Sequence, residues 1–213
     1  MKRATPSIRG CATLLSAGLL AMALTACDIT PAKTETPKIE TPSTALPVKA
    51  PVAALPTIRV KAGADADFKD AKGVVWKADS GFEGGSTIDR TGQITITGTD
   101  TPDIYMAEHY QMDSWSTKVP NGSYTVKLHF SEDYDGITSA TDRVFTYAVI
   151  DGGATGGKTI KEVKDFSPWK SAGAQYKAYV DSVPVTVTSG QITVKFTAQV
   201  ENPQINAIEV IPK

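Results

Sequence analysis

The chain has 213 residues, with 22 basic and 23 acidic side chains and a formal net charge of −1 at pH 7. Its basic residues form no patch or run, so the composition gives no support to nucleic-acid binding. Cys11 and Cys27 are the only cysteines, and both precede the segment that reads as folded, which excludes a disulfide framework there.

The first 26 residues predict a lipoprotein signal peptide. A positively charged start is followed by an apolar run over 12–24, which is shorter than the roughly 20 residues of a membrane-spanning helix. The run ends in "LTAC", which resembles the lipobox that precedes a lipidated cysteine. We therefore expect lipidation at Cys27, with the domain held on a membrane of the cell envelope, outside the cytoplasm. The alternative is an ordinary signal peptide cleaved near Ala26, which would leave Cys27 as a free thiol.

The segment 27–57 predicts a disordered tether. Six of the chain's 13 prolines lie in it, and no aromatic residue occurs before Phe68. Such a segment cannot bury enough apolar surface to offset the entropy of ordering it. An extended proline-rich chain rises about 3.1 Å per residue, so the tether could reach roughly 90 Å from the membrane.

Residues 58–213 predict one all-β domain, because apolar and polar residues alternate in many short segments bounded by turn residues. An antiparallel β-sandwich fits this pattern, and a jelly roll is the expected topology because its two sheets hide a core without disulfides. The sequences "PNGS" and "TSGQ" suggest hairpin connections. The expected strands are 57–62, 93–98, 103–108, 123–130, 143–150, 177–187, 191–198 and 205–211.

The strand 123–130 runs into an acidic loop, "SEDYDG", which could serve a metal, a pair of catalytic carboxylates or a polar ligand. Asp133, Asp135 and Gly136 form a D-x-D-G fragment, but the spacing excludes an EF-hand calcium loop. A calcium ion elsewhere in the sandwich stays open. The domain offers only His109 and His129 for zinc, and His129 is expected to be solvated on the polar face of its strand. We predict no metal and no cofactor.

Catalysis has little support in the sequence. A glycosidase needs two carboxyl groups facing each other across a cleft, and no sequence feature pairs any two of the candidates. A nucleophile elbow of the form G-x-S-x-G is absent. We therefore predict that the domain is not an enzyme. The carboxyl candidates are Glu108, Glu132, Asp133, Asp135 and Glu201.

Sugar binding has more support, because sugars present C–H faces to aromatic rings and hydroxyls to carboxylates and amides. Three segments, 104–113, 131–136 and 199–204, carry that mixture. Tyr105 could be a core residue, whereas Tyr134 lies between two aspartates in a turn. Glu201 and Asn202 supply a carboxylate and an amide in the last segment.

Together these segments resemble the malectin family of carbohydrate-binding domains over nearly all of 58–212. The resemblance is carried by "WKADSGFEGG", "TPDIYMAEHY", "VPNGSYTVKLHFSEDYDG", "RVFTYAVIDG", "SGQITVKF" and "NPQINAIEVI". It implies a jelly-roll sandwich that binds glucose-containing oligosaccharides in loops at one end. Bacterial relatives often accompany glycoside hydrolases as binding modules.

The family's binding positions fall on Tyr110, Tyr134 and Glu201. Asp135 stands where the animal protein has an aromatic residue, and the segment between "FEGG" and "TITG" lacks the family's tyrosine, so two stacking surfaces are missing. Glu132 is expected to brace the loop through backbone N–H groups. We predict non-catalytic carbohydrate binding through Tyr110, Tyr134, Asp135, Glu201 and Asn202. The alternative is an envelope structural or protein-interaction domain that keeps the fold and binds no sugar.

Overall fold

The computed structural model describes residues 54–213. The expected signal peptide, Cys27 and most of the expected tether lie outside the described residues. At the tether's described end, Leu55 packs against the core of the domain. Within the described part of the chain, no helix is long and apolar enough to cross a membrane.

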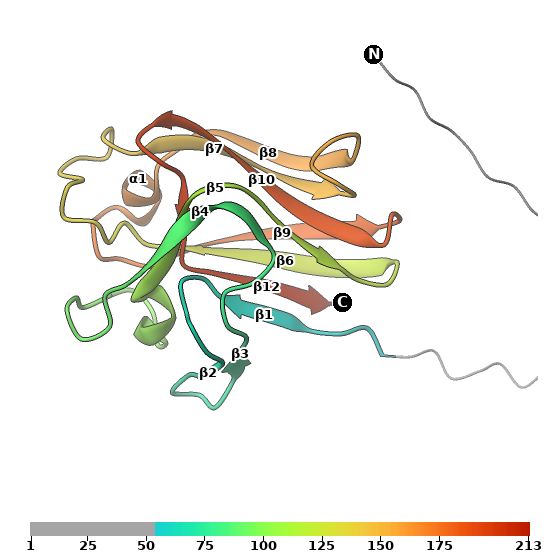
Figure 1. The fold of residues 1–213 in the computed structure, drawn as a ribbon, viewed down its shortest axis with the longest axis horizontal. Coiled ribbons are helices and arrows are strands. Elements are labelled where there is room, and N and C mark those ends of the chain that lie inside the picture. The colour runs from blue at the N-terminus through green and yellow to red at the C-terminus, as the bar shows by residue number, and fades with distance from the viewer. Residues whose placement is uncertain (1–53) are drawn as a thin grey trace, which may run out of the picture. The chain divides into compact units, whose positions relative to one another are not determined.

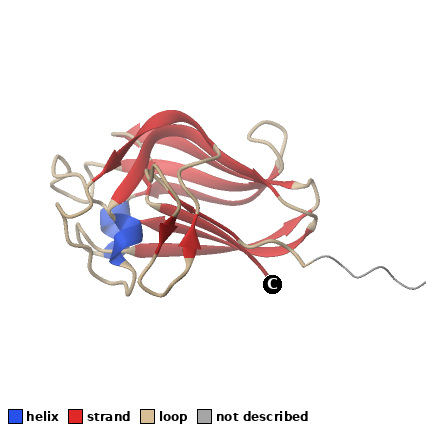
Figure 2. Ribbon diagram, turned by 60° about the horizontal axis from the view of Figure 1, so that its bottom comes forward, coloured by secondary structure: helices blue, strands red, loops and turns tan. Residues whose placement is uncertain are grey.

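Two antiparallel sheets pack face to face (Figures 1 and 2). The smaller one has the strand order β1 (Ile58–Lys61), β12 (Ala207–Pro212), β6 (Gly122–Phe130) and β9 (Tyr179–Val187). The larger one has the order β11 (Gln204–Ile205), β5 (Ala107–Lys118), β10 (Gln191–Val200), β7 (Val144–Asp151) and β8 (Lys158–Phe166), and β4 (Phe82–Asp89) also pairs with β5. A short pair, β2 (Phe68–Lys69) and β3 (Val75–Trp76), stands apart. The predicted all-β, jelly-roll sandwich is confirmed.

The main core lies between the two sheets, and β6 shows why it forms. Tyr124, Val126, Leu128 and Phe130 alternate along the strand and are all fully buried. Fully burying an apolar side chain of this size contributes about 1.5–3 kcal/mol. The facing strands supply a matching set from the larger sheet: Phe145, Tyr147, Val149, Ile192, Val194 and Phe196.

Two strand predictions are wrong, and both fall on segments that contribute to a second, smaller core on the other face of the smaller sheet. Pro102–Tyr105 forms a 3-10 helix, so the predicted strand 103–108 is wrong in its first half. Ile104 and Tyr105 are both 1% exposed, and two adjacent side chains of a strand cannot face the same core. The predicted strand 93–98 is also wrong, because only Thr97 makes a bridge there, to Lys177.

The two predicted hairpin turns are instead crossings between sheets. "PNGS" joins β5 to β6 and "TSGQ" joins β9 to β10, and in both cases the two strands belong to different sheets. The two turns lie side by side, since the Gly190 backbone N–H donates to Asn121 Oδ1 over 2.9 Å. Turn residues predict a tight connection, but they do not tell which sheet the next strand joins.

Four strands, β2, β3, β4 and β8, were not predicted, and neither were most of β5 and helix α1 (Pro168–Ala172). In β4 and β8 most side chains are exposed or half-buried, and charged residues interrupt any apolar alternation. Both lie at edges of the larger sheet, where charge discourages pairing with other chains. Helix α1 carries readable end signals: Ser167 caps it, Pro168 starts it and Gly173 ends it at a φ of 82°.

His129 is not solvated as predicted, because the second core covers its face of β6. Its Nδ1 lies 2.8 Å from the Tyr105 hydroxyl and its Nε2 lies 3.1 Å from Glu209 Oε1. Burial would raise the pKa of Glu209, but hydrogen bonds with His129 and Arg59 outweigh it and bring that pKa to about 2. His129 therefore belongs to a buried polar network of the fold.

Candidate functional site

The acidic loop after β6 lies at the end of the sandwich where α1 and the loop after β4 also lie (Figure 1). Ser131, Glu132 and Asp133 are fully buried, and the chain then turns outward so that Tyr134 is 45% exposed. Asn206 holds the start of the loop: its Oδ1 accepts from the Ser131 backbone N–H over 2.6 Å. Its Nδ2 donates to Asp133 over 3.2 Å. Asn206 thus anchors the buried start of the loop, and the tip of the loop, residues 134–136, is exposed to solvent.

Arg143 joins this loop to the loop after β10. Its Nε donates to Glu132 Oε2 over 2.8 Å, and Nη1 donates to the Asn202 carbonyl over 2.6 Å. The other oxygen of Glu132 accepts from the Tyr134 backbone N–H over 3.3 Å, which agrees with the bracing role expected for Glu132. Burial raises the pKa of Glu132 to about 6 even though Arg143 opposes the shift. The ion pair is the part of this brace that the sequence did not reveal.

Arg90, directly after β4, links the acidic loop to the start of β5. Its Nη1 donates to Glu108 Oε1 over 3.0 Å and to Asp133 Oδ1 over 3.2 Å. Burial, together with the charge of Glu108, raises the pKa of Asp133 well above its usual range, although Arg90 opposes this. One guanidinium therefore ties the end of β4, the start of β5 and the acidic loop together.

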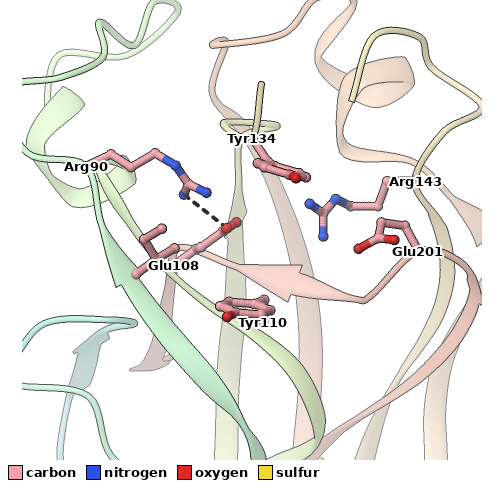
Figure 3. A pocket seen from close by; sticks show the side chains of 7 residues that line it. Arg90, Glu108, Tyr110, Tyr134, Arg143 and Glu201 are labelled. Carbon is pink, nitrogen blue, oxygen red and sulfur yellow. Dashed lines mark hydrogen bonds and ion pairs between the residues drawn. The ribbon is translucent and has the colours of Figure 1, made fainter. Parts of the chain in front are cut away.

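Between these two links lies a cavity of about 250 Å³, which we call the tyrosine pocket. In Figure 3 the rings of Tyr134 and Tyr110 lie on opposite sides of it, with Arg90 and Glu108 toward one side and Arg143 and Glu201 toward the other. It is smaller than the roughly 300–1,000 Å³ usual for drug-sized ligands, so it suits one ring of a larger molecule. The lining residues are Ile88, Arg90, Glu108, Tyr110, Tyr134, Arg143 and Glu201.

Three of the five predicted binding residues meet in this pocket: Tyr110, Tyr134 and Glu201. Asp135 lies instead in a neighbouring hollow that also touches Arg90, where the Tyr176 hydroxyl donates to it. This hydrogen bond raises the pKa of Tyr176 to about 12. Asn202 lines a third hollow, and its Nδ2 donates to Glu201 Oε1 over 3.1 Å. Asn202 therefore positions Glu201 rather than lining the tyrosine pocket.

The two arginines of the pocket were missed, although the sequence carries a sign of them. The domain has many lysines but only three arginines, Arg59, Arg90 and Arg143. Each of the three forms an ion pair with a carboxylate that is itself buried. Arginine suits such pairs because its guanidinium is always charged and donates several hydrogen bonds in a fixed geometry.

The carboxyl groups considered for catalysis or metal binding are mostly engaged. Glu132 and Asp133 are fully buried, and each is paired with an arginine. Within residues 54–213, no group of three or more His, Cys, Asp or Glu side chains is arranged to hold a metal ion. The small cavity is lined by two tyrosine rings and by hydrogen-bond donors and acceptors, a combination that suits the binding of a small polar ring.

The family profile described as Malectin domain matches residues 57–208. Among solved structures, the chain is similar to a β-glucuronidase of Bacteroides uniformis, with 17% identity and a TM-score of 0.62 over 74% of this chain and 18% of that one. It is also similar to the extracellular domain of ANXUR1 from Arabidopsis thaliana, with 16% identity and a TM-score of 0.59 over 72% of this chain and 47% of that one. The chain thus spans less than a fifth of the first protein and about half of the second, and the likeness concerns the fold. No curated protein matches the sequence.

Proposed function

Because the chain belongs to the malectin-domain family, we propose that it binds a carbohydrate in the tyrosine pocket without cleaving it. The observation that carries the proposal is the pair of tyrosine rings on opposite sides of one small cavity (Figure 3). A pyranose ring can place its C–H faces against Tyr110 and Tyr134 and turn its hydroxyls toward Glu108, Glu201 and Arg143. Glucose-containing oligosaccharides, which the family resemblance implies, are the first ligands to try.

Binding without cleavage is supported by the state of the carboxyl groups. Hydrolysis of a glycosidic bond needs two of them at the scissile bond, one to donate a proton and one to attack or to activate water. Glu132 and Asp133 are fully buried and paired with arginines. Of the two carboxyl groups that line the pocket, Glu108 is 2% exposed and paired with Arg90, which leaves Glu201 as the exposed carboxylate of the lining. A product assay on every bound glycan tests this directly, and release of a shorter glycan would contradict it.

A glycan array probed with residues 58–213 tests the proposed function. Reproducible hits support carbohydrate binding, and they identify the sugar and its linkage. A blank array would favour the alternative, an envelope structural or protein-interaction domain with the same fold.

Tyr134→Ala is expected to weaken binding of an array hit about tenfold or more. An aromatic contact of this kind contributes about 0.5–1.5 kcal/mol beyond its buried area, and about 1.4 kcal/mol is a factor of ten in affinity. Because Tyr134 is 45% exposed, the melting temperature should hardly change. Titration calorimetry and a thermal melt measure the two quantities. A variant that unfolds, or one that binds as tightly as the wild type, would show that the ring has another role.

We further propose that the domain is anchored to an envelope membrane through a lipid on Cys27, with residues 28–57 as the tether. The support is the order of charge, apolar run and "LTAC" in the sequence. Anchoring by lipid contributes about 0.8 kcal/mol per buried methylene, and stable attachment takes more than one acyl chain.

Cys27→Ser is therefore expected to move the protein from the membrane fraction to the soluble fraction while the folded domain stays intact. Fractionation with an immunoblot, alongside circular dichroism of the purified variant, measures both. Unchanged membrane association would mean that the protein is held there by something other than lipid on Cys27.

A further inference from the structure

Both arginines that line the tyrosine pocket already form ion pairs with carboxylates of the protein. Arg90 is paired with Glu108 and Asp133, and Arg143 is paired with Glu132. Glu201, in contrast, forms no ion pair with any of the described residues, and the Asn202 amide is its hydrogen-bond partner. The pocket thus presents a carboxylate whose charge is not neutralised and offers no cation that is free of a partner.

Glu108 adds unused acceptor capacity to the pocket wall. The residue is only 2% exposed, and its Oε1 accepts from Arg90 over 3.0 Å. Among residues 54–213, no hydrogen-bond donor reaches its Oε2. A buried carboxylate oxygen without a donor is costly, so a group that supplies a proton or a hydrogen bond at this wall is stabilised. When Asp133 is protonated, as burial and the neighbouring Glu108 favour, its carboxyl group can supply part of the missing hydrogen bonding to Glu108.

The charge around the pocket is not positive, whichever of its buried acids are protonated. Four carboxyl groups line it or lie directly behind it, Glu108, Glu132, Asp133 and Glu201, against the two guanidinium groups of Arg90 and Arg143. Protonation of Asp133 leaves three carboxylates against two cations, and protonation of Glu132 as well, whose pKa is about 6, leaves Glu108 and Glu201 against the two arginines. A ligand carboxylate or sulfate would meet only guanidinium groups that already pair with carboxylates. An ammonium group would meet Glu201, which has no ion pair among the described residues, and would form charge-assisted hydrogen bonds with it.

We propose that the tyrosine pocket selects sugars that carry a free amine and rejects acidic sugars. Glu201 is the residue that binds the protonated amine. This inference rests on the proposed function, because it specifies the ligand of the same pocket. The chemical class is an amino sugar with a protonated 2-amino or equivalent group. The ring faces of Tyr110 and Tyr134 hold its C–H surfaces, and the carboxylates meet its cation.

Titration of the purified chain with matched glycans tests the inference. The glycans share linkage and length and differ at one sugar, which bears a free amine, an N-acetyl group, a hydroxyl or a carboxylate. The work is done near pH 6, where an amine with a pKa of about 7.7–8 is protonated. We expect the amine form to bind about tenfold more tightly than the hydroxyl form, the advantage to shrink as salt is added, and the carboxylate form not to bind.

Glu201→Gln keeps the shape of the side chain and removes its charge, so the amine preference should fall to about twofold or less while the melting temperature is kept. Glu162→Gln, on β8 and away from the pocket, makes the same change of net charge and should leave the preference as it was. Equal binding of the amine and hydroxyl forms, or binding of the carboxylate form, would overturn the inference and leave carbohydrate binding standing. Binding of no glycan at all would remove the proposed function and the inference together.

Discussion

Arg143→Met is expected to lower the free energy of unfolding by about 3–5 kcal/mol, the usual cost of removing one partner of a buried ion pair. The substitution leaves the Glu132 carboxylate fully buried without its cation, and it frees the Asn202 carbonyl that Nη1 now holds. The acidic loop and the loop after β10 would then lose their link, so sugar binding should weaken as well. Urea unfolding followed by circular dichroism measures the loss of stability.

The pH dependence of that loss separates the ion pair from simple packing. Glu132 has a pKa of about 6 with Arg143 present, and removing the cation raises it further. The two proteins differ in the ionisation of Glu132 only above pH 6, where the wild type keeps a paired carboxylate and the variant has to hold the proton or bury the unpaired charge. The deficit of Arg143→Met should therefore grow as the pH rises above 6 and shrink to a smaller, constant value at and below pH 6. The double variant Glu132→Gln with Arg143→Met should recover part of the stability. A deficit under about 1 kcal/mol that does not change with pH would contradict this role.

Phe130→Ala is expected to cost about 3–5 kcal/mol of stability, as large truncations in well-packed cores do. Phe130 is fully buried at the end of β6, and its ring centroid lies 4.7 Å from that of Phe166 and 5.6 Å from that of Tyr147. Truncation leaves a cavity among these rings that the surrounding sheets cannot close. Chemical unfolding measures the change.

Phe130→Leu provides the control, because it keeps most of the apolar volume and should cost much less. Phe130 does not line the tyrosine pocket, so the folded fraction of Phe130→Ala should bind sugar more nearly as the wild type does than Tyr134→Ala. A loss of affinity larger than that of Tyr134→Ala would show that the loop after β6 depends on this core more than its anchors imply.

The fold could be predicted where one face of a strand meets the main core. The alternation of Tyr124, Val126, Leu128 and Phe130 follows directly from a strand with one buried face. The edge strands β4 and β8 could not be found in this way, because strands with little buried surface have no strict alternation to reveal them. Ile104 and Tyr105 suggest a strand from sequence, but a second core, assembled from distant segments, buries these two adjacent residues together.

The site was only partly predictable for a similar reason. Tyr134 stands out because an aromatic residue between aspartates in a turn is awkward to bury. The rarity of arginine marks Arg90 and Arg143 but does not show their partners. Asp133 lies 43 residues from Arg90 and Glu132 lies 11 residues from Arg143, so only the fold brings them together. The placement of Asp135 in a neighbouring hollow depends on its hydrogen bond with Tyr176. The backbone of Tyr176 has a φ of 54°, and the local sequence did not predict this conformation.

A crystal structure of the domain with the best ligand of the glycan array would show where that ligand binds. We expect a sugar ring in the tyrosine pocket, with its faces against Tyr110 and Tyr134 and with Glu201 within hydrogen-bond distance of a ligand donor. A ligand bound on another face of the sandwich, with the tyrosine pocket empty, would contradict this expectation.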